Sequence, residues 1–143
     1  RIDGLVEASP FYASVVLRAL GRIGWHDLAI RFIRDRWGTR FVDRGFPTCL
    51  EDWGENGSWR HGEYSGFMRS HSHSWSAGPA QYFLHDLIGL EILEPGCRRV
   101  CVKPAVIDRD YRVTCPTPAG DISVEVTDGR VEITSDPGIE QVD

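Results

Sequence analysis

Apolar residues recur at helical spacing near the start of the chain. Ser9 and Pro10 predict a helix start, because Ser is a favoured N-cap residue and Pro fits the first helical position. Gly21 and Gly24 close the segment. The apolar positions between them are Tyr12, Val16, Ala19, Leu20 and Ile23. The spacing predicts an amphipathic helix.

Two further helices are predicted. Asp27 can cap the second, which ends at Gly38 and forms a helical hairpin with the first. Its apolar residues are Leu28, Phe32, Ile33 and Trp37. The third starts between Ser76 and Pro79 and ends at Gly89, with a stripe made of Ala80, Phe83, Leu84, Leu87 and Ile88. This third helix is the most apolar, so we expect several neighbours to bury it.

After residue 94 the apolar period changes from 3.6 to 2. Alternating patterns over 99–103, 111–114, 122–127 and 130–134 predict strands. Asp128 and Gly129 fit a two-residue type I′ turn between the last two of them. The end of the chain is therefore predicted to be an antiparallel β module.

Helices and strands are thus segregated along the chain, which favours an α+β fold or two subdomains. The shift in composition near Glu94 to Arg98 marks the boundary. We place a helical part at residues 1–94 and a β part at residues 95–143.

Composition and charge exclude several classes of protein. The 143 residues suit one domain, and 41% hydrophobic with 26% charged residues is typical of a globular protein. A net charge of −5, with arginines interleaved among acids, argues against a nucleic-acid partner. No apolar run is long enough to cross a membrane. The cysteines are too sparse for a disulfide scaffold, so we expect four thiols in or near the core: Cys49, Cys97, Cys101 and Cys115.

The chemistry concentrates in residues 48–75, "TCLEDWGENGSWRHGEYSGFMRSHSHSW", which fit neither helix nor strand. Such long irregular segments in compact domains are usually functional or disordered, and five large aromatic rings argue against disorder. Indole rings stack on sugar rings while carboxylates and imidazoles bind hydroxyls. Hydrolysis of a glycosidic bond needs two carboxyl groups. The candidates for one of them are Glu51, Asp52, Glu55 and Glu63.

Each candidate has an ordinary alternative. Asp52 and Glu55 can pair with arginines or bond backbone N–H groups in the Gly54–Gly57 turn. Glu51 follows Leu50, and an apolar surround favours it as a proton acceptor. A metal site is a further alternative, in which His71 and His73 share one face of a strand with His61 or Glu63 as a third ligand. Because this spacing matches no zinc motif, no metal or other cofactor is predicted.

Four stretches together resemble the C-terminal part of the bacterial α-L-rhamnosidases of glycoside hydrolase family 78. "ASPFY" (8–12) leads into the helical hairpin, which ends in "IRDRWG" (33–38). "TCLEDW" (48–53) is similar to the family's Thr-x-x-Glu-x-Trp element, and "SHSHSW" (70–75) is similar to Ser-x-Asn-His-aromatic. Leu50 and Ser72 stand where the family usually has Trp and Asn. The match covers nearly the whole chain.

The resemblance implies the last helices of an (α/α)6 barrel, followed by a small C-terminal β-sandwich segment. It implies inverting hydrolysis of rhamnosides, with Glu51 as general base and His73 in contact with the sugar. Trp53, whose indole can stack on a sugar ring, is a second predicted sugar-binding residue. The family's general acid lies on earlier barrel helices. We therefore expect the 143-residue chain to be inactive alone, because an inverting reaction needs both carboxyl groups.

The implied partner is a rhamnose-containing glycan or glycoside. Uncovered barrel faces would also expose apolar patches that favour self-association. The alternative function is a non-catalytic carbohydrate-binding or interaction module, in which the aromatic span forms a platform and the carboxylates are structural.

Overall fold

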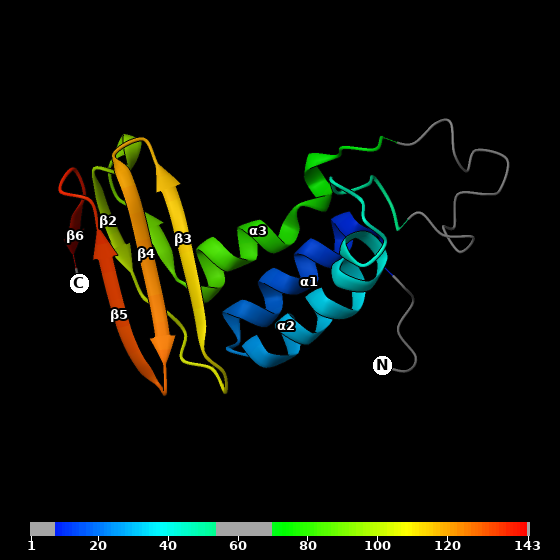
Figure 1. Ribbon diagram of the computed structural model, residues 1–143, viewed down its shortest axis with the longest axis horizontal. Helices are drawn as coiled ribbons and strands as arrows, with labels where there is room; N and C mark the ends of the chain where they lie inside the picture. Colours follow the sequence, from blue (N-terminus) through cyan, green and yellow to red (C-terminus); the bar gives the residue numbers. More distant parts are fainter. Residues whose placement is uncertain (1–7, 54–69, 143) are drawn as a thin grey trace, which may run out of the picture.

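The computed structural model describes residues 8–53 and 70–142. Helices α1 (Pro10–Arg22) and α2 (His26–Ile33) run side by side as a hairpin (Figure 1). α1 begins where predicted, with Ser9 extended at the N-cap and Pro10 at the first helical position. The Ser9 side chain makes no capping hydrogen bond, so Pro10 and the bond from Ala13 N to Ser9 O (2.8 Å) define the start.

The predicted end of the second helix at Gly38 is wrong. The helix starts at His26, which places Asp27 in its first turn, and it continues as a wider π-helical segment, η1 (Arg34–Val42). Trp37 and Phe41 lie four residues apart on η1 and are 4% and 3% exposed. Burying two large rings outweighs the roughly 1 kcal/mol cost of a glycine inside a helix.

The third helical region has the predicted bounds, beginning at Gly78 and ending just before Gly89, but it changes its winding along its length. A 3₁₀ turn, η3 (Ser74–Ser76), leads into α3 (Gly78–Tyr82), which continues as the π-helical segment η4 (Phe83–Leu87). α3 lies alongside α1 (Figure 1). The approach is close because Gly78 has no side chain: an added Cβ would lie 2.6 Å from Ser14 Cβ.

Two small sheets form the other end of the molecule (Figure 1). β3 (Tyr111–Thr117), β4 (Gly120–Thr127) and β5 (Arg130–Ser135) form the predicted antiparallel meander. Asp128 and Gly129 both have positive φ angles (49° and 73°), as a type I′ turn requires. The second sheet has the order β1–β2–β6, with β1 (Leu90–Ile92), β2 (Arg99–Val102) and β6 (Glu140–Val142). Its parallel β2–β6 pair was not predicted.

The chain is thus a mixed α+β structure with two hydrophobic clusters. One lies among the helices and includes Leu17, Trp37 and Tyr82. The other lies under the sheets and includes Val100 and Val124. β1 precedes the predicted boundary at residues 94 and 95, yet it pairs with β2 beyond that boundary. Three of the four cysteines are buried and Cys49 is half-buried, all as free thiols, which confirms the expected thiols.

Of the apolar stripe that the sequence singled out, α1 buries only Leu20. Ala13, Leu17 and Leu20 point into the core. Tyr12, on the predicted stripe, is 63% exposed and Ile23 is 59% exposed. The helix is apolar around most of its circumference, so periodicity could not decide which face the neighbours α2 and α3 cover.

A polar cluster lies where the helices meet the β part. The His26 Nδ1 atom and the fully buried Tyr82 hydroxyl share a hydrogen bond of 2.9 Å. Arg109 reaches Asp27 at 3.7 Å, and the buried Oδ2 atom of Asp86 has no hydrogen-bond partner among residues 8–53 and 70–142. Burial, helped by Asp86 and Asp27, raises the pKa of Tyr82, so the phenol keeps its proton.

This cluster makes stability depend on pH in a defined direction. Burial lowers the pKa of His26 from 6.5, although Asp86 and Asp27 act in the opposite direction. The unfolded chain therefore binds this proton at a higher pH than the folded chain. The contribution of neutral His26 to the free energy of unfolding is complete above the pKa of the unfolded chain. It is lost as the pH falls from 6.5 towards the pKa of the folded chain.

We therefore expect the free energy of unfolding, measured in urea, to fall between about pH 7.5 and about pH 5.5. The fall should be smaller in His26→Gln than in the parent. His71→Gln, which replaces an exposed imidazole, is the matched control and should behave as the parent does. An equal fall in His26→Gln would show that this histidine contributes nothing to it.

Candidate functional site

Two segments far apart in the sequence lie side by side at the end of the helical part away from the sheets (Figure 1). Glu51 N donates to Ser70 O at 2.9 Å, and His73 N donates to Cys49 O at 2.9 Å. The Thr48 hydroxyl donates to His71 O. These bonds hold residues 48–51 against 70–73. The candidates Glu55, His61 and Glu63, and the aromatic residues Trp59, Tyr64 and Phe67, lie outside the described residues.

The pairing brings the two predicted site residues together. The Glu51 Oε2 atom lies 4.0 Å from His73 Nδ1, and it accepts a hydrogen bond of 2.9 Å from Ser70 N. The two side chains are 27% and 29% exposed, respectively. Glu51 therefore has one oxygen fixed by the backbone and keeps access to solvent. A carboxylate held in this way beside an imidazole can accept or hold a proton.

The backbone behind Glu51 is fixed as well. Its carbonyl oxygen accepts hydrogen bonds from Trp75 Nε1 (3.2 Å) and from the hydroxyl of Ser76 (3.4 Å). Ser76 is fully buried, and its own carbonyl oxygen accepts a bond of 2.6 Å from Trp37 Nε1. The main chain of Glu51 is thus anchored through η3 to the core helix η1.

Trp75 is a site residue that the sequence reasoning did not single out. Its ring lies 4.1 Å from the His73 ring and 5.5 Å from the Phe11 ring, measured between centroids. Trp75 and Phe11 are each 44% exposed. Its position in the Ser-His-Ser-Trp stretch was the available signal. An exposed indole can provide an apolar face for a ligand beside the carboxylate and the imidazole.

The structure gives Trp53 a different environment from the predicted sugar contact. Trp53 is 6% exposed and packs edge-on against Trp37, with centroids 4.9 Å apart. The Arg40 guanidinium lies 5.2 Å from its centroid, and its Nε1 atom donates to Ala8 O at 2.7 Å. Neighbouring side chains thus occupy its surface. The sequence could not distinguish this core indole from the exposed one at Trp75, because both sit among polar residues.

The metal alternative finds no support in the described part of the chain. Among residues 8–53 and 70–142, no three His, Cys, Asp or Glu side chains group as metal ligands would. His71 is exposed, and His73 turns its Nδ1 atom toward Glu51. The proposed third ligands His61 and Glu63 fall outside the described residues.

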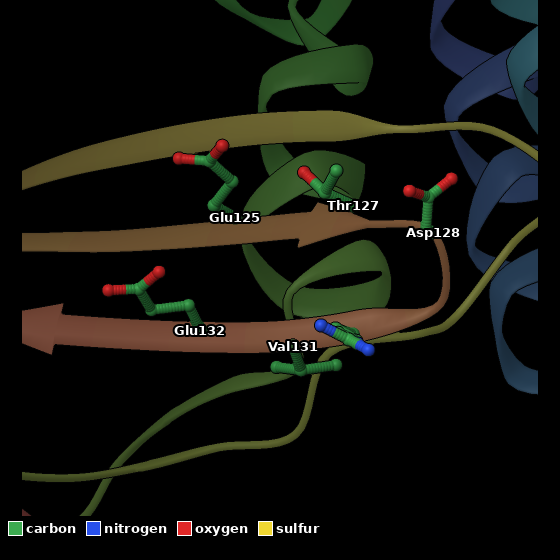
Figure 2. Close-up of a pocket in the computed structure, with 6 residues that line it drawn as sticks. Glu125, Thr127, Asp128, Val131 and Glu132 are labelled. Carbon is green, nitrogen blue, oxygen red and sulfur yellow. The ribbon is translucent and has the colours of Figure 1, made fainter.

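A larger hollow, about 710 Å³, lies on the β4–β5 hairpin, far from Glu51. Figure 2 shows Glu125 and Thr127 on β4 beside Glu132 on β5. Glu125 and Glu132 are directly opposite each other in the register, and Arg112 approaches Glu125 at 4.0 Å. All of these side chains are exposed. The hollow is a solvated sheet face with paired surface charges.

A second hollow lies beside the site. This groove has a volume of about 310 Å³ between α1 and the segment that leads into α3. Its lining residues are Phe11, Ser14, Val15, Arg18, Ser74, Trp75, Ala77, Gly78 and Gln81. It extends the exposed surface of Trp75 along α1.

Comparison with known proteins adds no relative. No protein-family model matches the chain, and no curated protein matches it. In the part of the chain that the structure describes, no helix has the length and apolar character to cross a membrane.

Proposed function

We propose that this chain is one wall of the sugar site of a glycosidase resembling the α-L-rhamnosidases. The observation that carries the proposal is the approach of the Glu51 carboxylate to the His73 imidazole at 4.0 Å, both partly open to solvent. The two residues come from separate segments. Their meeting, next to an exposed indole, is the arrangement that a sugar site needs.

In this proposal Glu51 is the general base of an inverting hydrolysis. The hydrogen bond from Ser70 N fixes Oε2, which leaves lone pairs of the carboxylate to take a proton from the attacking water. His73 binds a sugar hydroxyl, and Trp75 supplies the stacking surface that the sequence had led us to expect from Trp53. The general acid is contributed by helices outside these 143 residues, so the chain alone is expected not to hydrolyse a rhamnoside.

The exposed face of α1 supports the barrel architecture implied by the resemblance. Tyr12 and Ile23 are 63% and 59% exposed, and Trp25 at the start of α2 is 59% exposed. Large exposed apolar side chains that gather on one surface mark a site that a neighbour covers. In an (α/α)6 barrel, adjacent helical hairpins would cover them, and without that cover the chain should self-associate.

A non-catalytic carbohydrate-binding module is the second candidate function. The exposed rings of Phe11 and Trp75 favour it, because an aromatic platform binds sugar without any acid or base. This module would bind a saccharide tightly as the isolated chain. A single wall of a barrel site should bind it weakly, and calorimetric titration with rhamnose separates the two.

The proposed function is tested on a joined enzyme, a single protein that contains this chain and the barrel helices that carry the general acid. We expect it to release p-nitrophenol from an aryl α-L-rhamnoside, and no release above buffer would contradict the proposal. His73→Ala should raise KM by about tenfold with a smaller change in kcat, since it removes a hydrogen bond to the bound sugar. His71→Ala, two residues away and exposed, is the control. Equal effects of both variants would remove His73 from the site.

A further inference from the structure

The two ends of the groove beside Trp75 are lined by different kinds of side chain. One end is aromatic, with Phe11 and Trp75 in tilted contact at 5.5 Å. Arg18 lies seven residues after Phe11 on α1, about 11 Å further along the helix axis. Gln81, on α3, also lines the groove. The groove therefore offers a stacking surface and, at a distance of two helical turns, a guanidinium and an amide.

The described residues that line the groove give it one positive charge. None of them is acidic. Within the described residues Arg18 forms no ion pair, although other exposed arginines do, as Arg99 does with Glu140. A groove with one guanidinium and no carboxylate attracts an anion, and Arg binds a carboxylate through two parallel hydrogen bonds.

The walls of the groove are held in place. Ser14, at its floor, donates to Pro10 O at 2.9 Å and lies 3.4 Å from Trp75 O. Gly78 packs directly against Ser14, where an added Cβ would be 2.6 Å from Ser14 Cβ. α1 and the Trp75 segment are thus in direct contact under the groove. A ligand would meet a preformed surface.

We propose that this groove binds a saccharide that carries a hexuronic acid. One sugar ring stacks on Trp75 and Phe11, the carboxylate of the next ring pairs with Arg18, and the Gln81 amide bonds a hydroxyl. This inference rests on the proposed function, since it takes the chain to be part of a carbohydrate site. It goes beyond that function by assigning an adjoining subsite, which shares Trp75 with the site of Glu51 and His73 and selects for negative charge.

The test is binding, not hydrolysis. The 143-residue chain is titrated with three disaccharides containing glucuronic, galacturonic or mannuronic acid, each beside its neutral counterpart, and the Trp75 indole N–H signal is followed by NMR. We expect at least one acid to bind about tenfold more tightly than its neutral counterpart. Arg18→Gln should abolish that preference and leave binding of the neutral sugar unchanged. Arg22→Gln, on the same helix but outside the groove, is the matched control.

Three results would overturn the inference: no acid preferred over its neutral counterpart, a preference that survives Arg18→Gln, or an equal loss in Arg22→Gln. The outcome is independent of catalysis. If Arg18-dependent binding is found while the joined enzyme hydrolyses no rhamnoside, the subsite stands and the rhamnosidase proposal fails. If hydrolysis is found without that preference, only the subsite fails.

Discussion

Glu51→Gln is expected to lower kcat for rhamnoside hydrolysis by about 10²- to 10⁴-fold in the joined enzyme. The amide oxygen of Gln can still accept the hydrogen bond from Ser70 N, so the local structure should persist. It cannot accept the proton of the attacking water. KM should change little, because the loss falls on the transition state and not on substrate binding.

The control is Glu94→Gln, which removes an exposed carboxylate outside the site and should leave kcat unchanged. Far-ultraviolet circular dichroism would establish that both variants keep the fold. A kcat in Glu51→Gln within twofold of the parent would reject the role of Glu51 as base. The carboxylate would then be structural, held by Ser70 and His73.

Gly89→Ala is expected to be strongly destabilising, costing roughly 3–5 kcal/mol. Gly89 links η4 to β1 with a φ of 61°, which disfavours any residue with a Cβ. An added Cβ would also collide with the main chain of Lys103, at 2.9 Å from its carbonyl carbon and closer still to its oxygen. That main chain cannot move away easily, because Lys103 N bonds Gly89 O at 3.3 Å.

Gly24→Ala isolates the backbone component of this cost. Gly24 has a similar φ of 76°, but an added Cβ would meet nothing within 4 Å. It should cost only about 1 kcal/mol, the difference between glycine and alanine in a left-handed conformation. Thermal unfolding should therefore show a fall in Tm of about 10 °C or more for Gly89→Ala and of a few degrees for Gly24→Ala. Equal falls in Tm would mean that the main chain at Lys103 shifts to accommodate the added methyl group.

Local patterns predicted the elements better than their ends. The Ser9-Pro10 start and the Asp128-Gly129 turn were placed correctly, because each depends on backbone preferences of the residues themselves. The end of the second helix was misplaced at Gly38. The burial of Trp37 and Phe41 carries η1 past that glycine, and no local pattern contains this contact.

For the candidate site, too, residue types could be read from the sequence, whereas exposure could not. The sequence singled out Glu51 and His73, whose residue types suit sugar chemistry, and the structure places them 4.0 Å apart. The sequence could not show which of the two indoles, Trp53 or Trp75, is exposed. Trp53 enters the core and Trp75 stays 44% exposed, and the difference arises from packing against η1 and Phe11. The sequence did not predict a role for Arg18, because that role depends on the groove that surrounds the side chain.

By itself, the sequence determined the α+β character and the order of helices before the main strands, since these follow from short-range periodicity and residue type. Only the tertiary structure decided which face of α1 is buried, how β6 returns to pair in parallel with β2, and that the segments around Glu51 and His73 meet. Those outcomes depend on contacts between residues distant in the chain, where competing packings have similar local preferences. The physical reason is that burial and hydrogen bonding are properties of the assembled molecule.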